Sequence, residues 1–228
     1  MSKAKILIVD DEPSIVKLVE AYLKPEGYEV LTASDGNAGL KAARAFKPDL
    51  LILDVMLPGM DGIELLSRLR RESEVYVIML TARTDEMDKI VGLTVGADDY
   101  VTKPFSPREL TARVKAALRR IQTGAASRSD TTVLAFRHIR IDAGARQVAV
   151  DDQPVELTAL EFDLLRALAE NRGRVLTREQ LLENVWGGEY FGETRVVDVH
   201  LGHVRQKIGD QFIVTVRGVG YRFEDELL

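Results

Sequence analysis

The chain has 228 residues, of which 46% are hydrophobic and 29% are charged, a balance typical of globular proteins. No apolar stretch approaches the ~20 residues of a membrane span, the first residues turn acidic too soon for a secretory signal, and the lack of cysteine excludes disulfides and thiolate-bound metals. The net charge of −5 gives no general sign of nucleic-acid binding. These features fit a cytoplasmic protein of one large or two ordinary domains.

Up to about residue 121, short apolar segments alternate with segments of helical periodicity. The apolar segments, which predict strands, are 5–10, 28–33, 49–54, 75–80 and 98–103. The periodic segments, which predict helices, lie near 13–24, 36–46, 61–71, 84–94 and 106–120. Strands that alternate with helices favour a parallel sheet covered on both faces. We therefore predict an α/β doubly wound domain with five parallel strands over residues 1–121.

The remaining chain has a different order of elements. Residues 122–132 are small and polar without periodicity, which indicates a flexible linker. Over residues 133–228 short alternating segments come first, helices follow from about 158, 177 and 194, and a hairpin closes the chain. Capping boxes open two of these helices, at Thr158–Glu161 and Thr177–Gln180. This order predicts a separate α+β domain.

Carboxylates follow two of the predicted strands in the first half: Asp10 and Asp11 end the first strand, and Asp54 ends the third. In a doubly wound sheet these strands are neighbours at the point where the strand order reverses, so the carboxylates should converge. Three anions repel one another unless a cation neutralises them, and oxygen ligands without His or Cys favour Mg²⁺. Thr81 and Lys103 end the fourth and fifth strands and would add a hydroxyl and an ammonium.

A carboxylate in such a cluster can attack a phosphoryl group and become an aspartyl phosphate. The cation and Lys103 would then hold the phosphoryl oxygens. Each residue alone has a simpler explanation, because an Asp after a strand is usually a turn or cap residue, as we expect for Asp61. Five suitable residues at neighbouring strand ends together favour a phosphoacceptor site.

Four motifs carry a family resemblance: IVDDE, LDVMLPGMDG, MLTA and GADDYVTKPF resemble the signatures of response-regulator receiver domains over residues 3–121. The resemblance implies that Asp54 accepts a phosphoryl group from a histidine kinase. It also implies a Mg²⁺ site formed by Asp11, Asp54 and the backbone carbonyl of Met56, with Asp10 assisting.

The same resemblance gives roles to residues of the last two strands. Thr81 and Lys103 would contact the phosphoryl group, and the Lys103–Pro104 bond is expected to be cis. Tyr100 would turn inward when Thr81 moves toward the phosphoryl group, which makes these two the switch residues. From the sequence alone, a partly buried core position is the simpler expectation for Tyr100.

An enzyme is the first alternative, because phosphatases of the haloacid-dehalogenase type also use a nucleophilic Asp after a strand. They carry a second Asp two residues later as acid and base, and Met56 stands at that position here. We therefore expect no enzyme, but a phosphorylated form that persists as a signal.

Charged residues flank the fifth strand, and such residues usually form only a solvated surface. In regulators of the OmpR/PhoB type the matching positions pair across a symmetric dimer. The resemblance implies a homodimer on phosphorylation with the pairs Lys89–Glu109, Asp99–Arg113 and Asp98–Arg120. Exposed pairs contribute only ~0–1 kcal/mol each, so they would set register more than affinity.

The second half carries 13 Lys and Arg against 17 Asp and Glu, which as a whole argues against DNA binding. Residues 195–222 differ, with five basic and two acidic residues. Their helix has a core stripe of Val197, Leu201, Val204 and Ile208. Its opposite face, suited to a major groove, carries Arg195, Val199, Gly202, His203 and Gln206. Arg217, beside two glycines at the hairpin tip, can reach a minor groove or the backbone.

Residues 133–225 resemble the winged-helix domain of OmpR/PhoB-type regulators through LTALEFDLLRALAENRGRVLTREQLLENVW, RVVDVHLGHVRQKI and TVRGVGYRF. The resemblance implies DNA contacts from Trp186, Arg195, His200, Arg205 and Arg217. Residues 202–203, Gly-His, stand where some relatives have two arginines, so we expect weaker binding with a flatter salt dependence.

These observations predict a two-component response regulator that binds promoter DNA as a dimer on tandem half-sites, about one helical turn (~10–10.5 bp) apart. RNA polymerase is a further candidate partner, and no membrane partner is expected. One alternative is a DNA-binding regulator that works without phosphorylation, and another is a winged helix that binds a protein.

Overall fold

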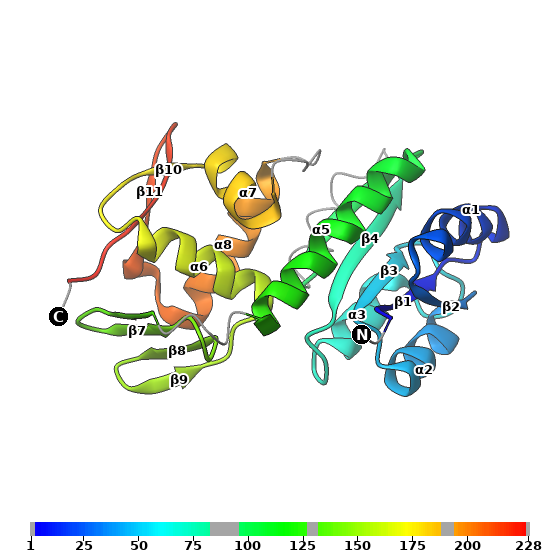
Figure 1. Cartoon of the computed structure of the whole chain (residues 1–228), viewed down its shortest axis with the longest axis horizontal. Coiled ribbons are helices and arrows are strands. Elements are labelled where there is room, and N and C mark those ends of the chain that lie inside the picture. The colour runs from blue at the N-terminus through cyan, green and yellow to red at the C-terminus, as the bar shows by residue number, and fades with distance from the viewer. Residues whose placement is uncertain (1–2, 83–95, 127–131, 188–193, 227–228) are drawn as a thin grey trace. The chain divides into compact units, whose positions relative to one another are not determined.

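The computed structural model describes residues 3–82, 96–126, 132–187 and 194–226. It divides into two compact units, unit 1 (Met1–Leu118) and unit 2 (Arg119–Leu228), each of which is described by itself (Figure 1). The predicted helix near 84–94 lies outside the described residues. Within them, no helix is both long and apolar enough to cross a membrane.

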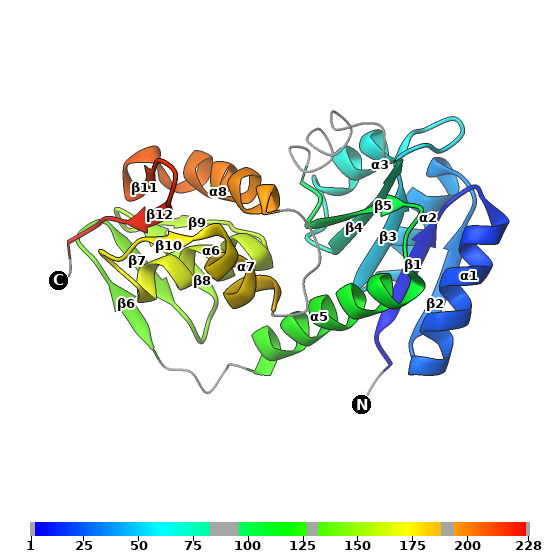
Figure 2. The same cartoon turned by 90° about the horizontal axis from the view of Figure 1, so that it is seen from above.

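Unit 1 contains one parallel sheet covered by helices. Its strands are β1 (Lys5–Val9), β2 (Glu29–Ala33), β3 (Leu50–Asp54), β4 (Tyr76–Ala82) and β5 (Asp99–Lys103), in the order β2-β1-β3-β4-β5. Its described helices are α1 (Pro13–Leu23), α2 (Gly36–Phe46), α3 (Gly62–Leu69) and the first part of α5 (Pro107–Ala126), which continues past Leu118 into unit 2, with the short 3-10 helix η1 (Lys24–Glu26) after α1. Figure 2 shows α1 and α5 on one face of the sheet and α2 and α3 on the other. The predicted doubly wound fold is confirmed.

The central strands are apolar because both of their faces are covered. Residues 6–9 of β1 and 50–53 of β3 are completely buried, which is typical of parallel strands between two helical layers. Asp61 caps α3 as expected, and its side chain accepts a hydrogen bond from the backbone N–H of Glu64 at 2.7 Å. This core fixes the strand ends, where the polar residues lie.

Helix α5 is longer than the sequence pattern predicts. The apolar periodicity ends near residue 121, but the helix continues to Ala126, so the first five residues of the predicted linker are helical. Gln122, Ala125 and Ala126 favour helix without extending the apolar stripe, and no proline interrupts the segment, although Gly124 disfavours helix. Absence of periodicity therefore did not mean absence of helix here.

In its described residues, unit 2 combines two antiparallel sheets with the three helices that follow α5. The four-stranded sheet consists of β6 (Val133–Ala135), β7 (Ile139–Asp142), β8 (Gln147–Val150) and β9 (Gln153–Val155). The helices are α6 (Ala159–Glu170), α7 (Arg178–Trp186) and α8 (Arg195–Ile208), and both predicted capping boxes are present. The second sheet has the order β10-β12-β11, from β10 (Leu176–Thr177), β11 (Ile213–Val216) and β12 (Gly220–Phe223), and the 3-10 helix η3 (Asp210–Phe212) precedes β11.

The last described residues of unit 2 are bonded to its first strands. The backbone N–H groups of His138 and Ile139 donate to one carboxylate oxygen of Asp225, at 3.0 and 2.9 Å. The backbone N–H of Arg137 donates to the carbonyl oxygen of Glu226 at 2.6 Å. The side chain of Arg172, just after α6, donates to the carbonyl oxygen of Asp225. Residues 225–226 thus join the turn between β6 and β7 to Arg172, just after α6.

Candidate functional site

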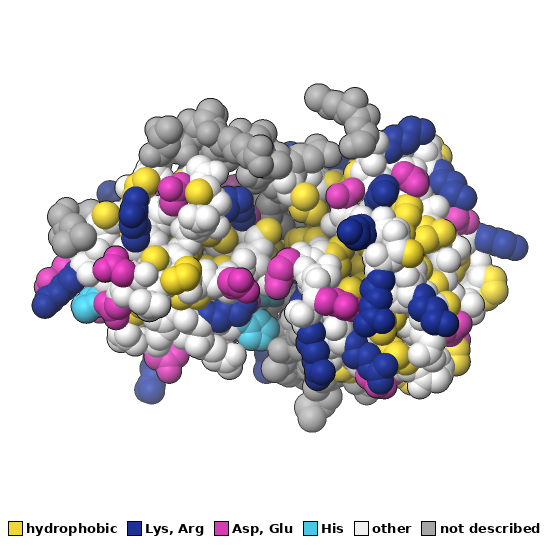
Figure 3. Space-filling view, turned by 90° about the horizontal axis from the view of Figure 1, so that it is seen from below, with side chains coloured by type: hydrophobic (Ala, Val, Ile, Leu, Met, Phe, Trp, Pro, Cys, Tyr) yellow, Lys and Arg dark blue, Asp and Glu magenta, His cyan; other side chains and the backbone are white. Residues whose placement is uncertain are grey.

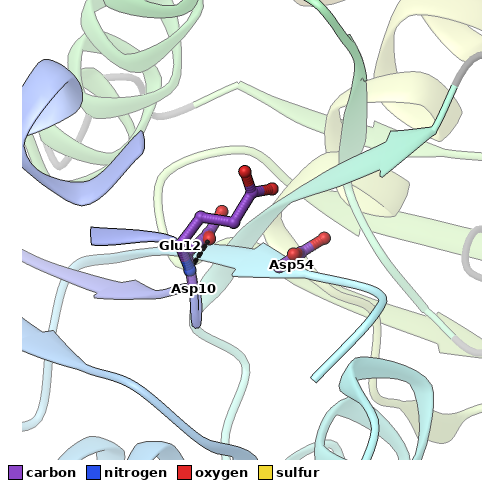
Figure 4. Close-up of side chains that lie close together, drawn as sticks. All are labelled: Asp10, Glu12 and Asp54. Atoms are coloured by element: carbon purple, nitrogen blue, oxygen red, sulfur yellow. Dashed lines mark hydrogen bonds between the residues drawn. The ribbon is translucent and has the colours of Figure 1, made fainter. Parts of the chain in front are cut away.

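Three carboxylates meet at the carboxyl edge of the parallel sheet in unit 1. Asp10 directly follows β1, Asp54 is the last residue of β3, and Glu12 precedes α1 as its N-cap. One carboxylate oxygen of each residue lies within 4.8 Å of the other two, and Figure 4 shows the three side chains extending into the same space. Because β1 and β3 are neighbours where the strand order reverses, residues far apart in the chain come together.

Lys103, the last residue of β5, bonds to all three carboxylates. Its Nζ donates to Asp10 and Asp54, both at 2.9 Å, and to Glu12 at 3.1 Å. An ammonium has three N–H donors, so one is directed to each carboxylate. Asp10 and Asp54 are buried, whereas Glu12 is exposed. One positive charge therefore balances part of three negative charges.

Burial raises the pKa of the Asp54 carboxyl above its usual value, because the surroundings disfavour the charged form and the hydrogen bond from Lys103 offsets this only in part. Burial by itself lowers the pKa of Lys103, but its hydrogen bonds to Asp10 and Asp54 outweigh this and raise it. Lys103 thus stays charged at neutral pH. The charge of Asp54 is incompletely compensated, which favours the approach of a cation or an electrophile.

The loop after Asp54 is closely packed against the end of β3. The backbone N–H of Met56 lies 3.4 Å from Oδ1 of Asp54, and that of Gly62 donates to the carbonyl oxygen of Val55 at 2.9 Å. A Cβ at Gly62 would lie 2.0 Å from the carbonyl oxygen of Asp54. Glycine is therefore required where α3 starts, because a side chain would push the loop away from the phosphoacceptor candidate.

Thr81 and Tyr100 lie on the two strands beyond β3. Thr81 directly follows the residue of β4 that is level with Asp54 on β3, and it pairs with the residue of β5 just before Lys103. Thr81 and Tyr100 are both buried. Asp54, Thr81 and Lys103 thus occupy the ends of three consecutive strands in the sheet, and the Lys103–Pro104 bond is cis as expected.

Helix α8 in unit 2 has one buried face and one accessible face. The predicted core stripe is confirmed, since all four of its residues are buried: Val197, Leu201, Val204 and Ile208. On the opposite face Arg195 and Gln206 are exposed, and three residues are partly exposed, namely Val199, Gly202 and His203. A Cβ added at Gly202 would meet no atom within 4 Å, so another molecule can approach the middle of this face closely.

Strands β11 and β12 form an antiparallel hairpin, here termed the wing (residues 213–223). Arg217 and Val219 are exposed at its turn, and Gly218 has a φ of +73°, which glycine adopts without strain. Figure 3 shows acidic and basic side chains intermixed on the visible face of unit 2. The local excess of basic residues lies in 195–222, the segment that contains α8 and the wing.

Two family models match the chain: the response regulator receiver domain over residues 6–115, and the C-terminal domain of transcriptional regulatory proteins over residues 152–223. The chain is 47% identical over 232 residues to the alkaline phosphatase synthesis transcriptional regulatory protein PhoP of Bacillus subtilis, with 97% of each chain covered. It is 45% identical over 224 residues to the sensory transduction protein RegX3 of Mycolicibacterium smegmatis, covering 96% of this chain and 98% of the relative. The structure of DrrB, an OmpR/PhoB homolog of Thermotoga maritima, matches with a TM-score of 0.53 at 37% identity, covering 97% of this chain and 99% of DrrB.

The chain is a response regulator of the OmpR/PhoB family. It is a two-component regulator of transcription, with a receiver domain in unit 1 and a winged-helix DNA-binding domain in unit 2. The family consists of transcription regulators rather than classical enzymes. Its receiver domain implies a histidine kinase as phosphodonor, and its C-terminal domain implies DNA as partner. The alternative of a regulator that works without phosphorylation is not favoured.

One carboxylate of the regulator's acidic cluster differs from the sequence expectation. Asp10, Asp54 and Lys103 come together as predicted, but Glu12 is the third carboxylate of the cluster, and Asp11 is exposed. The backbone N–H of Glu12 donates to Asp10 at 2.8 Å, which folds the segment back over the end of β1. Pro13 starts α1 and so fixes residue 12 as the N-cap, a signal in the sequence that could have identified Glu12.

Several residues of the predicted dimer face have partners inside unit 1. Nη1 of Arg113 lies 2.9 Å from both carboxylate oxygens of Asp99, and its Nη2 donates to Glu109 at 2.8 Å. Asp98 accepts from Arg70 and from the backbone N–H of Val77, both at 2.8 Å. Lys89 and the side chain of Arg120 lie outside the described residues. The pairing of these groups across a dimer remains a prediction.

The residues expected to contact DNA fall into three groups in the structure. Arg195 and Arg217 are exposed. Trp186 and His200 are buried, at 3% and 2% exposure, and their ring centres lie 5.8 Å apart. They therefore pack α7 against α8 inside unit 2. The guanidinium of Arg205 donates to the carbonyl oxygen of Ile213 in the wing, at 2.9 and 2.6 Å. Sequence alone did not separate these groups because burial depends on contacts distant in the chain.

Proposed function

We propose that Asp54 is the phosphoacceptor of this regulator. The observation that supports this is a buried carboxylate at the end of β3 whose nearest cation, Lys103, lies 2.9 Å away and only partly compensates its charge. A carboxylate oxygen of Asp54 attacks phosphorus, the bond from phosphorus to the kinase's histidine nitrogen breaks, and that nitrogen keeps the electron pair. Lys103 can bind the phosphoryl oxygens once they are attached to Asp54, because its ammonium already contacts that carboxylate.

The acidic cluster is the proposed site of Mg²⁺. Asp10, Glu12 and Asp54 supply carboxylate oxygens close to one another, and hard oxygen ligands without His or Cys suit this ion. Asp11 and the backbone carbonyl of Met56, the other proposed ligands, adjoin these residues in the chain. When bound, the ion supplies positive charge for the phosphoryl oxygens. All three carboxylates bond to the single ammonium of Lys103, which balances only part of their negative charge. This supports the binding of a further cation at the cluster.

The phosphorylated form persists because the rim of the site offers no general base at Met56. Its side chain is 68% exposed and carries a thioether, which neither activates water nor protonates a leaving group. Loss of the phosphoryl group therefore receives no acid or base assistance from residue 56, and we expect the aspartyl phosphate to last long enough to act as a signal.

Phosphorylation is transmitted by Thr81 and Tyr100 in this proposal. Both are buried, and Thr81 lies at the end of β4 between Asp54 and Lys103. Movement of Thr81 toward the phosphoryl group frees space into which the Tyr100 ring, already buried, turns further inward. The result is a homodimer through the surface of β5 and α5, with Lys89, Asp98, Asp99, Glu109, Arg113 and Arg120 as the residues that set its register.

Unit 2 of each protomer then binds one half-site of promoter DNA in the cytoplasm. Helix α8 enters the major groove with the face that carries Arg195, Val199, Gly202 and His203, and Arg217 reaches the minor groove or backbone from the wing. The exposure of Arg195 and Arg217 and the open space at Gly202 support this arrangement. RNA polymerase is the proposed partner of the DNA-bound dimer.

The test is selection of bound fragments from a random DNA pool by the full-length chain, with and without a small phosphodonor plus Mg²⁺. We expect a tandem repeat of about one helical turn to be enriched much more strongly with the phosphodonor. Asp54→Asn should lose this difference. Asp61→Asn is the matched control, because Asp61 is a helix cap and not a nucleophile.

The other outcomes separate the alternatives. Equal enrichment with and without phosphodonor would leave a DNA reader whose phosphoacceptor is not a switch. Enrichment of no sequence in either arm would overturn DNA recognition and favour a winged helix that binds a protein.

A further inference from the structure

The recognition helix α8 is tied to the wing at its N-terminal end by Asp198. Asp198 lies in the first turn of α8, and its Oδ1 accepts a hydrogen bond from the Tyr221 hydroxyl of β12 at 2.6 Å. The same oxygen accepts from Nε of Arg178, the first residue of α7, at 2.7 Å. The Arg178 guanidinium also lies 5.1 Å from the centre of the Tyr221 ring, within the range of a cation–π interaction. Three elements thus meet at one carboxylate oxygen.

A second set of hydrogen bonds joins α8 to the wing, two helical turns further along the helix. Arg205 lies seven residues after Asp198, so both side chains are on the same face of α8. Its guanidinium donates to the carbonyl oxygen of Ile213 and, at 2.8 Å, to the hydroxyl of Thr215, both in β11. The guanidinium carbon is 5.4 Å from the Tyr221 ring. The Tyr221 ring therefore lies between Arg178 and Arg205 and contacts the arginine of each set of hydrogen bonds.

We propose that Arg178, Asp198, Arg205 and Tyr221 form a clamp that positions the wing relative to α8 for DNA binding. These residues are positioning groups: they set the distance between the helix that reads bases and Arg217 at the wing tip. The proposal rests on the DNA contacts proposed above for α8 and Arg217. In this proposal Arg205 positions the DNA-binding surface formed by α8 and the wing, because its hydrogen bonds to β11 are made within the chain.

The geometry explains why the clamp matters for Arg217 in particular. The wing is a hairpin of two four-residue strands, and its outer strand β11 pairs only with β12 within the described sheet. A two-stranded hairpin is easily displaced unless other contacts fix it. Tyr221 pairs with Leu176 of β10 on one side and with Thr215 on the other, in the second residue pair from the turn, so it holds the hairpin close to its tip. A displacement there would move the tip, where Arg217 lies.

The test is a double-mutant cycle on DNA affinity with Tyr221→Phe and Arg217→Ala. Tyr221→Phe removes only the hydroxyl, which donates to Asp198 and accepts from Arg178 at 3.4 Å, and keeps the ring between the arginines. The probe is the duplex enriched from a random pool by the phosphorylated full-length chain. We expect Arg217→Ala to weaken binding by about fivefold or more in the otherwise unchanged chain, and by about twofold or less in Tyr221→Phe, because the arginine is no longer held in place.

Hydrogen exchange of the free chain gives an independent readout. Backbone amides of β11 and β12 should exchange faster in Tyr221→Phe, while those of α6 should not change. Asp198→Asn is the second variant if Tyr221→Phe does not fold, since it keeps the side-chain shape and weakens both hydrogen bonds. Glu170→Gln is the matched control, because it breaks a surface ion pair of α6 with Arg166 without touching α8 or the wing.

The outcomes distinguish the clamp from the contacts on which it rests. Equal losses for Arg217→Ala in both backgrounds, with unchanged exchange of β11 and β12, would overturn the clamp alone. No loss for Arg217→Ala in the otherwise unchanged chain would overturn the wing contact with DNA, and hydrogen exchange would then still decide whether Tyr221 holds the wing.

Discussion

The two functional regions of this regulator use charged side chains in opposite ways. At the acidic cluster, three carboxylates share one ammonium, and the charge of Asp54 is left incompletely compensated. Around α8, charged groups have partners within unit 2: Arg205 bonds to the wing, and Lys207 lies 2.7 Å from Glu161. A site that reacts with a charged group retains unbalanced charge, whereas a surface that reads another molecule uses much of its charge to hold its own shape.

The largest expected effect is the loss of phosphorylation in Asp54→Asn. An amide nitrogen or oxygen is too weak a nucleophile to form a stable acyl phosphate, so incorporation from a small phosphodonor with Mg²⁺ should fall to background. Intact-mass spectrometry detects the added phosphoryl group. Asp61→Asn should be phosphorylated normally, and phosphorylation of Asp54→Asn at the normal rate would place the phosphoacceptor elsewhere.

The charged residues near β5 test whether unit 1 also contains charges with a purely structural role. Arg113 is 4% exposed and pairs with Asp99 and Glu109. Arg113→Ala leaves Asp99 buried without this partner, which should cost about 3–5 kcal/mol of unfolding free energy. Arg68→Ala breaks an exposed pair with Glu64 and should cost less than ~0.5 kcal/mol. Urea unfolding followed by circular dichroism measures both, and similar costs would show that Arg113 is not structural.

The same substitution at two glycines should have opposite effects in the two regions. Gly62→Ala places a Cβ 2.0 Å from the carbonyl oxygen of Asp54 and should destabilise unit 1 by roughly 1–3 kcal/mol. Gly202 in α8 has no neighbouring atom within 4 Å of an added Cβ, so Gly202→Ala should stabilise unit 2 by about 1 kcal/mol.

The single tryptophan, Trp186, lies in unit 2, so its fluorescence follows the unfolding of unit 2 separately. Circular dichroism follows both units. A stabilising effect of Gly62→Ala would mean that the loop after Asp54 is not held as tightly as its packing indicates.

The smallest expected effect concerns stability and pH. Because burial raises the pKa of Asp54 in the folded chain, the folded state holds the proton to a higher pH than the unfolded state does. Stability therefore falls as pH rises from the ordinary aspartate range through the raised pKa. Asp54→Asn removes this loss, so it should be more stable than the unchanged chain at pH 7, with a smaller difference at acidic pH. Urea unfolding at both pH values measures this, and a difference independent of pH would contradict it.

Much of unit 1 was predictable because its signals are local. Apolar runs such as residues 50–53 mark buried strands, and the residues that follow them mark one edge of the sheet. Asp54, Thr81 and Lys103 could therefore be placed together without knowledge of side-chain positions. Pro13 marks Glu12 as the residue before α1, but it does not show that the chain turns back over the end of β1, and Glu12 was therefore missed.

Unit 2 was less predictable in its individual contacts. The stripe that includes Val197 and Leu201 follows from helical periodicity, and both residues are buried as predicted. The burial of Trp186 and the hydrogen bonds of Arg205 depend on packing between α7, α8 and the wing. A polar residue on a helix can face DNA or a neighbouring strand, and one-dimensional periodicity does not distinguish the two.

The hydrogen bonds between residues 225–226 and the start of β7 have a consequence for truncation of this domain. Residues 225 and 226 lie outside every described strand and helix, yet their oxygens accept the backbone N–H groups of Arg137, His138 and Ile139. Removing them would deprive these three donors of their present acceptors. It would weaken, without breaking, the connection of the four-stranded sheet to the helices, because Arg146 still pairs with Asp163 of α6.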